Sequence, residues 1–353
     1  MKNKNILITG GAGFIGSNFI PYFLKKYKKY NIINLDLLTY AGDLNNLKEV
    51  ENSKRYKFIK GDICNRELVE YIFKEFDIKG VIHFAAESHV DNSIKNPDVF
   101  IKTNVEGTFT LIDVAYKQWF KKPFKIKKKY KKCRFHHIST DEVYGSLNDT
   151  DLFTETTPYA PNSPYSASKA SSDMVVRSYC NTYGMNCVIT NCSNNYGPKQ
   201  HNEKLIPVII KNALQGDKIP IYGDGLNVRD WLYVKDHCSG IDKVFHSGKM
   251  GETYNIGGNN ERTNIEIVNT ICKILDKLSP VKQNGKLKSK NIQSYTELII
   301  FVQDRAGHDR RYAIDATKIQ TQLGWKAKEN FESGILKTIK WYLKKENNEN
   351  TIY

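Results

Sequence analysis

Short hydrophobic runs alternate with longer mixed segments through the first 190 residues of the chain. The runs at 5–9, 32–36, 56–59, 81–85, 135–139 and 188–192 are almost continuously apolar. Such runs are typical of parallel strands that are covered on both faces. The segments at 14–29, 65–76, 99–118 and 165–183 are long enough for crossover helices. The alternation therefore predicts an α/β fold with a Rossmann-type, doubly wound parallel sheet.

The pattern changes after about residue 191, where Gly and Pro separate shorter elements. Helices are expected at 205–214, 234–246, 264–278 and 331–345. We therefore expect two domains. The first is a dinucleotide-binding domain over 1–190, to which a later segment at about 231–256 returns. The second is a smaller C-terminal α/β substrate-binding domain over 191–353.

Composition narrows the class of protein. The 353 residues are 40% hydrophobic and 12% aromatic, which excludes bulk disorder, collagen and a coiled coil. No run reaches the roughly 18 apolar residues of a membrane helix, so we expect no membrane association. We expect the first strand to begin at Asn5 and therefore expect no secretory leader. Seven cysteines without a C-x-x-C pair favour reduced thiols and a cytoplasmic location.

The formal net charge of +15 is concentrated in one segment. Eight lysines fall within twelve residues: Lys121, Lys122, Lys125, Lys127, Lys128, Lys129, Lys131 and Lys132. We expect this segment to be a solvated loop at the amino end of the sheet, away from the ligand-binding edge. Evenly spaced aromatic residues for stacking on bases are absent from it. The charge therefore does not indicate nucleic-acid binding.

A glycine-rich turn follows the first predicted strand and opens the first helix. Gly10, Gly13 and Gly16 form the spacing G-x-x-G-x-x-G. The first glycine permits a tight turn, the second lets a pyrophosphate approach the backbone, and the third lets the helix pack closely on the strand. Asp36 ends the second strand 20 residues later, where a carboxylate can bond a ribose 2′-hydroxyl. The same carboxylate would repel a 2′-phosphate. The pattern favours NAD over NADP.

Two later strand ends extend the predicted cofactor site. Asp62 and Ile63 follow the third strand and are placed to hold the adenine, and Ala85 and Ala86 follow the fourth, on the nicotinamide side. For Asp62, an ordinary helix cap explains the residue equally well.

Tyr165 and Lys169 are spaced by four residues, which places both on one helix face. A lysine beside a phenol is expected to lower the phenol pKa, so that tyrosine can accept a hydroxyl proton during hydride transfer. Thr140 ends a strand about 25 residues earlier, and Asp141 and Glu142 follow it directly. An adjacent acid and base suit the elimination of water, although a solvated strand end would look similar.

With the glycine turn, these motifs are typical of extended short-chain dehydrogenase/reductases. The chain resembles one family among them, the dTDP-glucose 4,6-dehydratases of deoxysugar biosynthesis. The matching blocks include TGGAGFIGS, AAESHVD, FHHISTDEVYG, SPYSASKASSD, NCSNNYGP, EKLIP, RDWLYVKDH and DRAGHDRRYAID. They span residues 9–315, and the Asp-Glu pair in STDEVYG separates this family from related epimerases.

The resemblance implies a redox-neutral reaction on tightly held NAD. Tyr165 would deprotonate the glucose C4 hydroxyl, assisted by Thr140 and Lys169. Glu142 would then remove the C5 proton while Asp141 protonates the departing C6 hydroxyl. Hydride would return to C6 and give the 4-keto-6-deoxy sugar, which the resemblance implies is a precursor of dTDP-rhamnose.

The resemblance also implies two sets of binding residues and a homodimer formed by helices near 99–118 and 165–183. The cofactor set is Gly10, Gly13, Phe14, Ile15, Gly16, Asp36, Asp62, Ile63, Ala85, Ala86, Ser88, Thr103, Tyr165 and Lys169. The substrate set is Ser88, Asn195, Lys204, Leu205, Arg229, Asn264, Arg305 and His308. Lys204 and Arg229 could neutralise a diphosphate, whereas a structural salt bridge to Asp230 would also explain Arg229.

Other readings remain open at this stage. A UDP-sugar 4,6-dehydratase, a nucleotide-sugar 4-epimerase or a decarboxylase would share the fold. A degenerate nucleotide-sensing or nucleic-acid-binding relative is disfavoured because Glu142, Tyr165 and Lys169 are all present. No Cys/His spacing predicts a metal. Ala306 stands where the family pattern has proline, which puts the affinity for the base in question.

Overall fold

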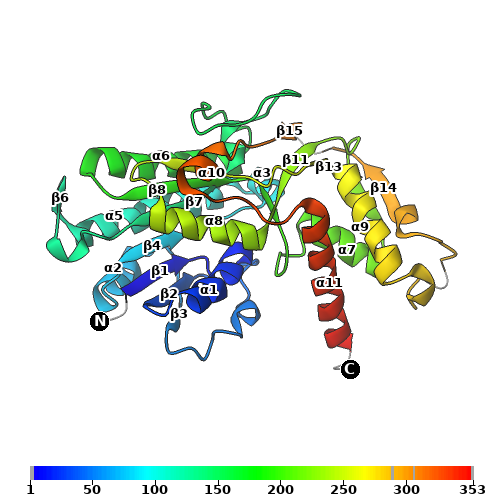
Figure 1. The fold of residues 1–353 in the computed structure, drawn as a ribbon, viewed down its shortest axis with the longest axis horizontal. Coiled ribbons are helices and arrows are strands. Elements are labelled where there is room, and N and C mark those ends of the chain that lie inside the picture. Colours follow the sequence, from blue (N-terminus) through cyan, green and yellow to red (C-terminus); the bar gives the residue numbers. More distant parts are fainter. Residues whose placement is uncertain (1–3, 288–289, 305–306, 351–353) are drawn as a thin grey trace.

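The computed structural model describes residues 4–287, 290–304 and 307–350. A seven-stranded, all-parallel sheet with the order β12-β8-β7-β4-β1-β2-β3 forms the larger part of the molecule (Figure 1). Its strands are β1 (Lys4–Thr9), β2 (Tyr30–Asp36), β3 (Tyr56–Lys60), β4 (Gly80–His83), β7 (Phe135–Thr140), β8 (Cys187–Cys192) and β12 (Thr253–Ile256). The predicted fold class, a doubly wound Rossmann-type sheet, is confirmed.

Helices cover both faces of this sheet. They are α1 (Phe14–Lys26), α2 (Arg66–Glu75), α3 (Val90–Lys95), α4 (Pro97–Phe100), α5 (Thr108–Trp119), α6 (Pro164–Tyr183), α8 (Val234–Ser247) and α10 (Thr317–Leu323). Phe19 and Phe23 of α1 pack with Phe245 of α8 in one hydrophobic core. Leu111 of α5 and Val176 of α6 belong to a second core on the opposite face. The near-continuous apolar strands are therefore buried from both sides, as their sequence predicts.

The remaining elements form a smaller body beside the carboxyl edge of the sheet. Its strands are β9 (Asn194–Tyr196), β10 (Ile219–Tyr222), β11 (Val228–Tyr233), β13 (Glu261–Thr263), β14 (Ile299–Val302) and β15 (Arg311–Tyr312). Its helices are α7 (Leu205–Gln215), α9 (Asn264–Leu278) and α11 (Phe331–Asn350), which pack around a third core (Figure 1). Short 3₁₀ turns lie at 44–47, 128–130, 141–144, 281–283 and 295–298.

The segment 99–118, predicted as one regular helix, is not a single regular α-helix. The chain there forms α4, then a π-helical segment η2 (Ile101–Gly107), and only then α5. Inside η2, the Asn104 side chain bonds both the amide and the carbonyl of Glu87 and the Ser168 hydroxyl. These bonds connect η2 to the loop after β4 and to α6. Because they link distant parts of the chain, the periodicity of the local sequence cannot predict them.

The lysine-rich segment is more ordered than the predicted loop. It contains an antiparallel hairpin of β5 (Phe120–Lys122) and β6 (Lys125–Ile126), followed by a 3₁₀ turn. The Lys127 ammonium donates to the carbonyls of Lys117 and Gln118 and so caps the end of α5. Lys129 lies 2.9 Å from Asp77. Two of the lysines therefore stabilise local structure.

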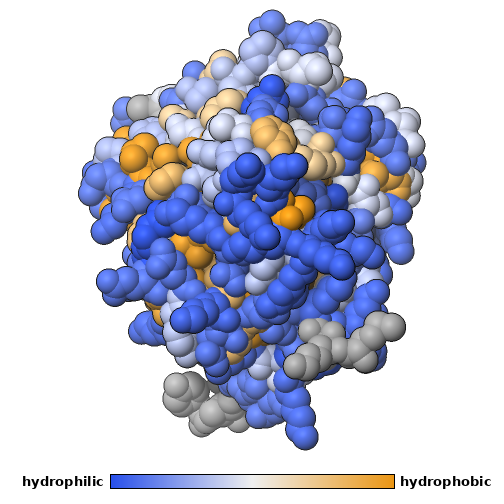
Figure 2. Space-filling model, turned by 90° about the vertical axis from the view of Figure 1, so that its left-hand side faces the viewer, coloured by the Kyte–Doolittle hydropathy of each residue, from blue (hydrophilic) through white to orange (hydrophobic). Residues whose placement is uncertain are grey.

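The hairpin lies at the left-hand end of the molecule in Figure 1, and Figure 2 views that side directly. The face seen there is mostly hydrophilic, with small hydrophobic patches. In the part of the chain that the structure describes, no helix combines the length and the apolar character that a membrane crossing requires.

Candidate active site

A cavity of about 320 Å³ lies at the carboxyl edge of the sheet, where open α/β sheets bind ligands. The ends of β1, β2, β3, β4 and β7 contribute to one wall, together with the start of α6. The segment after β8 and the loop before α7 form the facing wall. The cavity therefore joins the parallel sheet to the chain that leads into the smaller body.

The three glycines of the turn have different surroundings. Gly10 has φ +70°, and a Cβ there would lie 2.5 Å from the Ala85 nitrogen. A Cβ on Gly16 would lie 2.4 Å from the Gly10 carbonyl oxygen. At Gly13 the nearest atom is that same oxygen at 3.4 Å, and the residue borders the cavity. Two glycines therefore serve the turn and its packing, while Gly13 leaves space on the ligand side.

The carboxylate of Asp36 holds the loops that border the cavity. One oxygen accepts from the Ala12 amide at 2.8 Å, and the other accepts from the Leu38 amide at 2.9 Å. Asp62 accepts from the Cys64 amide at 2.8 Å, whereas Asn65 caps α2. The alternative reading of Asp62 as the helix cap is therefore wrong.

The structure brings every predicted cofactor residue to this one cavity. The residues on its wall are Gly10, Gly13, Phe14, Ile15, Gly16, Asp36, Asp62, Ile63, Ala85, Ala86, Ser88, Thr103, Tyr165 and Lys169. On the facing wall, two buried amide oxygens, Asn195 Oδ1 and Gln200 Oε1, have no hydrogen-bond partner among the described residues. The exposed N-terminus of α1, the Asp36 carboxylate and these acceptors fit a bound dinucleotide and a hydroxyl-rich ligand.

The five predicted catalytic residues border the same cavity. Thr140 ends β7, and Asp141 and Glu142 begin the 3₁₀ turn that follows it. Tyr165 and Lys169 lie in the first turns of α6. That helix begins where it does because Ser163 and Ser166 cap one another and Pro164 occupies the first helical position.

The surroundings of Asp141 favour the neutral form of its carboxyl group. Its side chain is 2% exposed, and burial raises its pKa well above the usual range, with the charges of Glu142 and Asp230 adding to the shift. Its Oδ2 atom has no hydrogen-bond partner in the part of the chain that the structure describes. A buried, protonated carboxyl group that faces a cavity can donate a proton to a departing hydroxyl.

The phenol of Tyr165 differs from the sequence expectation. Burial raises its pKa, the negative charge of Glu142 raises it further, and the hydrogen bond from Thr140 acts in the opposite direction. Lys169 is not among the leading influences on this pKa, and its ammonium group donates to the Ile138 carbonyl at 2.8 Å. Full burial lowers the pKa of Lys169 to about 8.

The predicted substrate residues fall into two groups. Ser88, Asn195 and Lys204 line the cavity, and the Lys204 ammonium donates to the Ser88 carbonyl at 3.0 Å. The other group lies in the smaller body and does not line the cavity: Leu205 begins α7, Arg229 lies in β11, Asn264 begins α9 and His308 precedes β15. Arg305 and Ala306 lie outside the described residues.

Arg229 does not form the salt bridge that the sequence left open. Its guanidinium donates to the carbonyls of Val228, Asp309 and Arg310, and it stacks 4.2 Å from the ring centroid of Tyr312. The carboxylate of Asp230 instead accepts from the amides of Gly258 and Asn260.

Sequence reasoning missed several polar residues of the cavity wall. Gln200, His201 and Glu203 all border it. Tyr40 approaches from the loop after β2 and packs edge-on against His201 at 5.5 Å between ring centroids. The position of Gln200, His201 and Glu203 beside or inside the block EKLIP was the available signal. Within the described ranges, no group of three His, Cys, Asp or Glu side chains is arranged to hold a metal ion.

Comparison with known proteins agrees with this geometry. The family model described as GDP-mannose 4,6 dehydratase matches residues 7–338. A dTDP-glucose 4,6-dehydratase from Neisseria gonorrhoeae is 52% identical over 341 residues, which cover 96% of each chain. The crystal structure of a dTDP-glucose 4,6-dehydratase from Bacillus anthracis, in complex with NAD, is 50% identical, covers 98% of both chains and gives a TM-score of 0.82. That of a dTDP-glucose 4,6-dehydratase from Streptomyces venezuelae, with NAD bound, is 42% identical with a TM-score of 0.85, covering 97% of this chain and 98% of the other.

The sheet, the glycine turn and the Tyr165–Lys169 pair define an extended short-chain dehydrogenase/reductase. The relatives and the family model narrow this class to the dehydratases. The chain belongs to the dTDP-glucose 4,6-dehydratase family of hydro-lyases.

Proposed function

We propose that this chain converts dTDP-glucose to dTDP-4-keto-6-deoxyglucose with NAD as a cofactor that is reduced and reoxidised in each turnover. The observation that carries the proposal is that residues suited to alcohol oxidation and residues suited to water elimination line the same cavity. Tyr165 and Lys169 supply the proton chemistry of alcohol oxidation, and the Asp141–Glu142 pair supplies an acid and a base. The family membership gives the substrate class.

Oxidation at C4 is the first step. The phenol of Tyr165 takes the C4 hydroxyl proton, and Thr140, hydrogen-bonded to that phenol, lies where it can contact the same sugar oxygen. Lys169, held against the Ile138 carbonyl, contributes positive charge beside the reacting hydroxyl. Bound NAD⁺ supplies the hydride acceptor, and the glycine turn and Asp36 would hold it.

Elimination follows because the C4 ketone acidifies the proton on C5. Glu142 removes that proton while the neutral Asp141 protonates the C6 hydroxyl as it leaves. The assignment of acid and base follows their surroundings, because Asp141 is 2% exposed in surroundings that favour its neutral form, whereas Glu142 is only partly buried. Hydride return to C6 and proton return to C5 complete a redox-neutral cycle.

The nucleotide part of the substrate is assigned to the facing wall. Ser88, Asn195 and Lys204 border the cavity, and Lys204 is placed to neutralise a phosphate. Arg229 and Asn264 extend this surface into the smaller body. A division into a cofactor domain, 1–190 with the returning segment 231–256, and a mainly substrate-binding domain, 191–353, is part of the proposal.

Two further proposals concern the assembly and the location of the protein. A homodimer through α5 and α6 is supported by the exposed hydrophobic side chains of Phe109 and Met174 on these helices. A cytoplasmic location is supported by the seven cysteines, all of which are free thiols. A place in deoxysugar biosynthesis follows from the product.

The test is incubation of the protein with dTDP-glucose and, separately, with UDP-glucose, followed by alkali. A 4-keto-6-deoxy sugar forms an enolate that absorbs near-ultraviolet light, and we expect this signal with dTDP-glucose. The signal with UDP-glucose alone would favour the UDP-sugar dehydratase. Inversion at C4 without loss of the C6 hydroxyl would identify an epimerase, and no conversion of either sugar would refute the proposal.

A further inference from the structure

A third polar residue follows the two that the mechanism uses on α6. Tyr165, Lys169 and Asp173 are spaced by four residues and so share one helix face. The Asp173 side chain is 1% exposed, although it carries a carboxyl group. Burying a carboxyl group costs free energy unless the group is hydrogen-bonded. Asp173 has no role in the dehydration steps described above.

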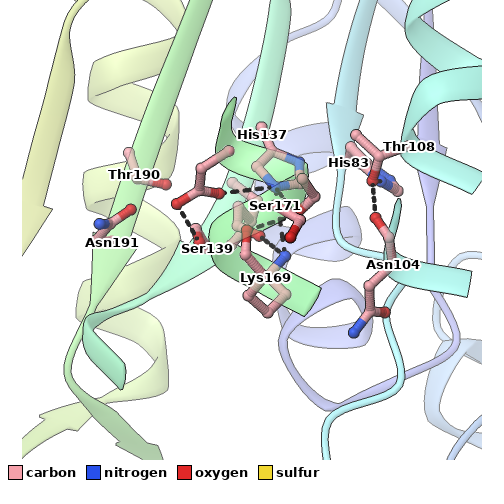
Figure 3. A network of polar contacts seen from close by, with 12 residues as sticks. His83, Asn104, Thr108, His137, Ser139, Lys169, Ser171, Thr190 and Asn191 are labelled. Carbon is pink, nitrogen blue, oxygen red and sulfur yellow. Dashed lines mark hydrogen bonds and ion pairs between the residues drawn. The ribbon is translucent and has the colours of Figure 1, made fainter. Parts of the chain in front are cut away.

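One imidazole nitrogen lies between the lysine and this carboxylate. Nε2 of His137, in β7, is 3.4 Å from the Lys169 Nζ atom and 3.1 Å from Asp173 Oδ1. Figure 3 shows the side chains of His137 and Lys169 pointing toward one another, with Ser139 beside them. The other carboxylate oxygen, Oδ2, accepts from the Ser139 and Tyr159 hydroxyls, each at 2.9 Å. A row of close polar contacts therefore runs from Lys169 to Tyr159. The contact between His137 and Asp173 Oδ1 is short but lacks hydrogen-bond geometry, and His137 Nε2 also lies 3.1 Å from the Ser172 hydroxyl.

The far end of this row of contacts reaches a second cavity, of about 210 Å³. Asp173 and Tyr159 line it, and Pro158, from the segment before α6, is an exposed residue of its lining. Lys169 borders the active-site cavity and does not border this one. The row of contacts thus connects the active site to solvent by a path that avoids the active-site cavity.

The reaction exchanges no net proton with solvent, but each turnover leaves one proton too many on Tyr165 and one too few on Asp141, and a path to solvent lets each residue reset separately. In each turnover Tyr165 gains the C4 hydroxyl proton, Asp141 loses the proton that leaves in water, and Glu142 returns its proton to C5. Tyr165 must therefore release one proton and Asp141 must regain one. The phenol is 8% exposed and borders a cavity that the nucleotide sugar would fill.

We propose that His137, Asp173 and Tyr159 form a proton exit that connects Lys169 to solvent through the second cavity. The inference rests on the proposed dehydration. In the first step the Nζ–H bond of Lys169 breaks and an Nε2–H bond forms on His137. That bond then breaks as an O–H bond forms on Asp173, which releases the proton toward the Tyr159 hydroxyl and the cavity. No electrons are exchanged, and Lys169 regains a proton from the side of Tyr165.

The charge states of the two ends suit transfer near neutral pH. Burial lowers the pKa of Lys169 to about 8, with the charge of Asp173 opposing the shift, and burial raises the pKa of Asp173 to about 6. The other titratable groups that face this pair from neighbouring elements are His83 of β4, His137 of β7, Tyr144, Tyr159 and Cys192 of β8. Burial keeps both histidines neutral, so His137 serves as a transient carrier.

The experiment uses the NAD-loaded enzyme and compares Asp173→Asn and Tyr159→Phe with the wild type. Asp113→Asn is the matched control, because this carboxylate bonds Arg66 and Tyr179 and is not part of the row of contacts. For Asp173→Asn we expect kcat to fall by about tenfold to a hundredfold with KM unchanged. The pH dependence of NADH formation in one turnover should shift about one unit toward acid, because Lys169 loses its opposite charge. Tyr159→Phe should lower kcat less and leave the first turnover unchanged.

Chemical rescue separates proton transfer from a structural role. Formate, a small carboxylate, should restore part of kcat in Asp173→Ala and have no effect on the control. Wild-type kcat in both test variants, or a loss of kcat with neither a pH shift nor rescue, would overturn the exit. If the Asp173 variants do not fold, Tyr159→Phe decides alone: a lower kcat supports the exit and an unchanged kcat overturns it. Inactivity of the wild type on dTDP-glucose would instead refute the proposed function.

Discussion

Gly13 and Gly16 share one motif, yet alanine at the two positions should have opposite consequences. Gly13 has φ −75° and ψ 179°, which alanine adopts without strain, and its Cβ would point into space next to the cavity. Gly13→Ala should change the free energy of unfolding by less than about 1 kcal/mol. NAD affinity should fall at least about tenfold, or about 1.4 kcal/mol, because the methyl group occupies the approach of the pyrophosphate.

Gly16→Ala places its methyl 2.4 Å from the Gly10 oxygen and 2.6 Å from the Gly11 Cα, both backbone atoms that cannot rotate away. We expect a loss of about 3 kcal/mol of stability, the upper end of the usual cost of overpacking. Urea unfolding of the NAD-free protein and calorimetric titration with NAD measure the two effects separately.

Gly285→Ala is the matched control, because a Cβ there meets no atom within 4 Å. It should leave both stability and NAD affinity unchanged. The reasoning is refuted if Gly13→Ala binds NAD as the wild type does, or if Gly16→Ala is as stable as the wild type. Either result would mean that the turn adapts to a side chain more readily than its contacts indicate.

Three other variants test the remaining site. Glu142→Gln should still form NADH from dTDP-glucose in a single turnover but release no 4-keto-6-deoxy product, and normal turnover would contradict its role as the base. Because the folded-state pKa of Asp141 is raised, the stability that this group contributes is present below its unfolded pKa and is lost as pH rises through the folded value. Asp141→Asn should therefore be inactive yet about 1 kcal/mol more stable than the wild type at alkaline pH, with the gain vanishing in acid, as pH-dependent urea unfolding would show. Lys204→Met should raise KM for dTDP-glucose about tenfold or more with a smaller change in kcat, since a phosphate loses its counter-charge; an unchanged KM in steady-state assays would exclude the contact.

The parts of the site that follow strand ends were predictable from the sequence. Gly10, Asp36, Ala85 and Thr140 each stand just after or at the end of an apolar run, and parallel strands bring such positions to one edge. The four-residue spacing of Tyr165 and Lys169 likewise fixed their common face without any knowledge of the tertiary structure.

Features that depend on packing across elements were not predictable. The π-helical segment around Asn104 exists because that side chain is held by Glu87 and Ser168, which are distant in the sequence. The pKa of Tyr165 is set by burial and by Glu142, and a sequence pattern reports neither. The Ile138 carbonyl that accepts from Lys169 is a backbone group and carries no side-chain signature.

The strand order has a consequence for synthesis of the chain on the ribosome. β12 closes the sheet by pairing with β8, although some 60 residues separate them in the sequence. Until residue 256 has emerged, β8 presents an unpaired, apolar edge, and such edges promote association between nascent chains. Chains that stall between β8 and β12 should therefore depend most strongly on chaperones.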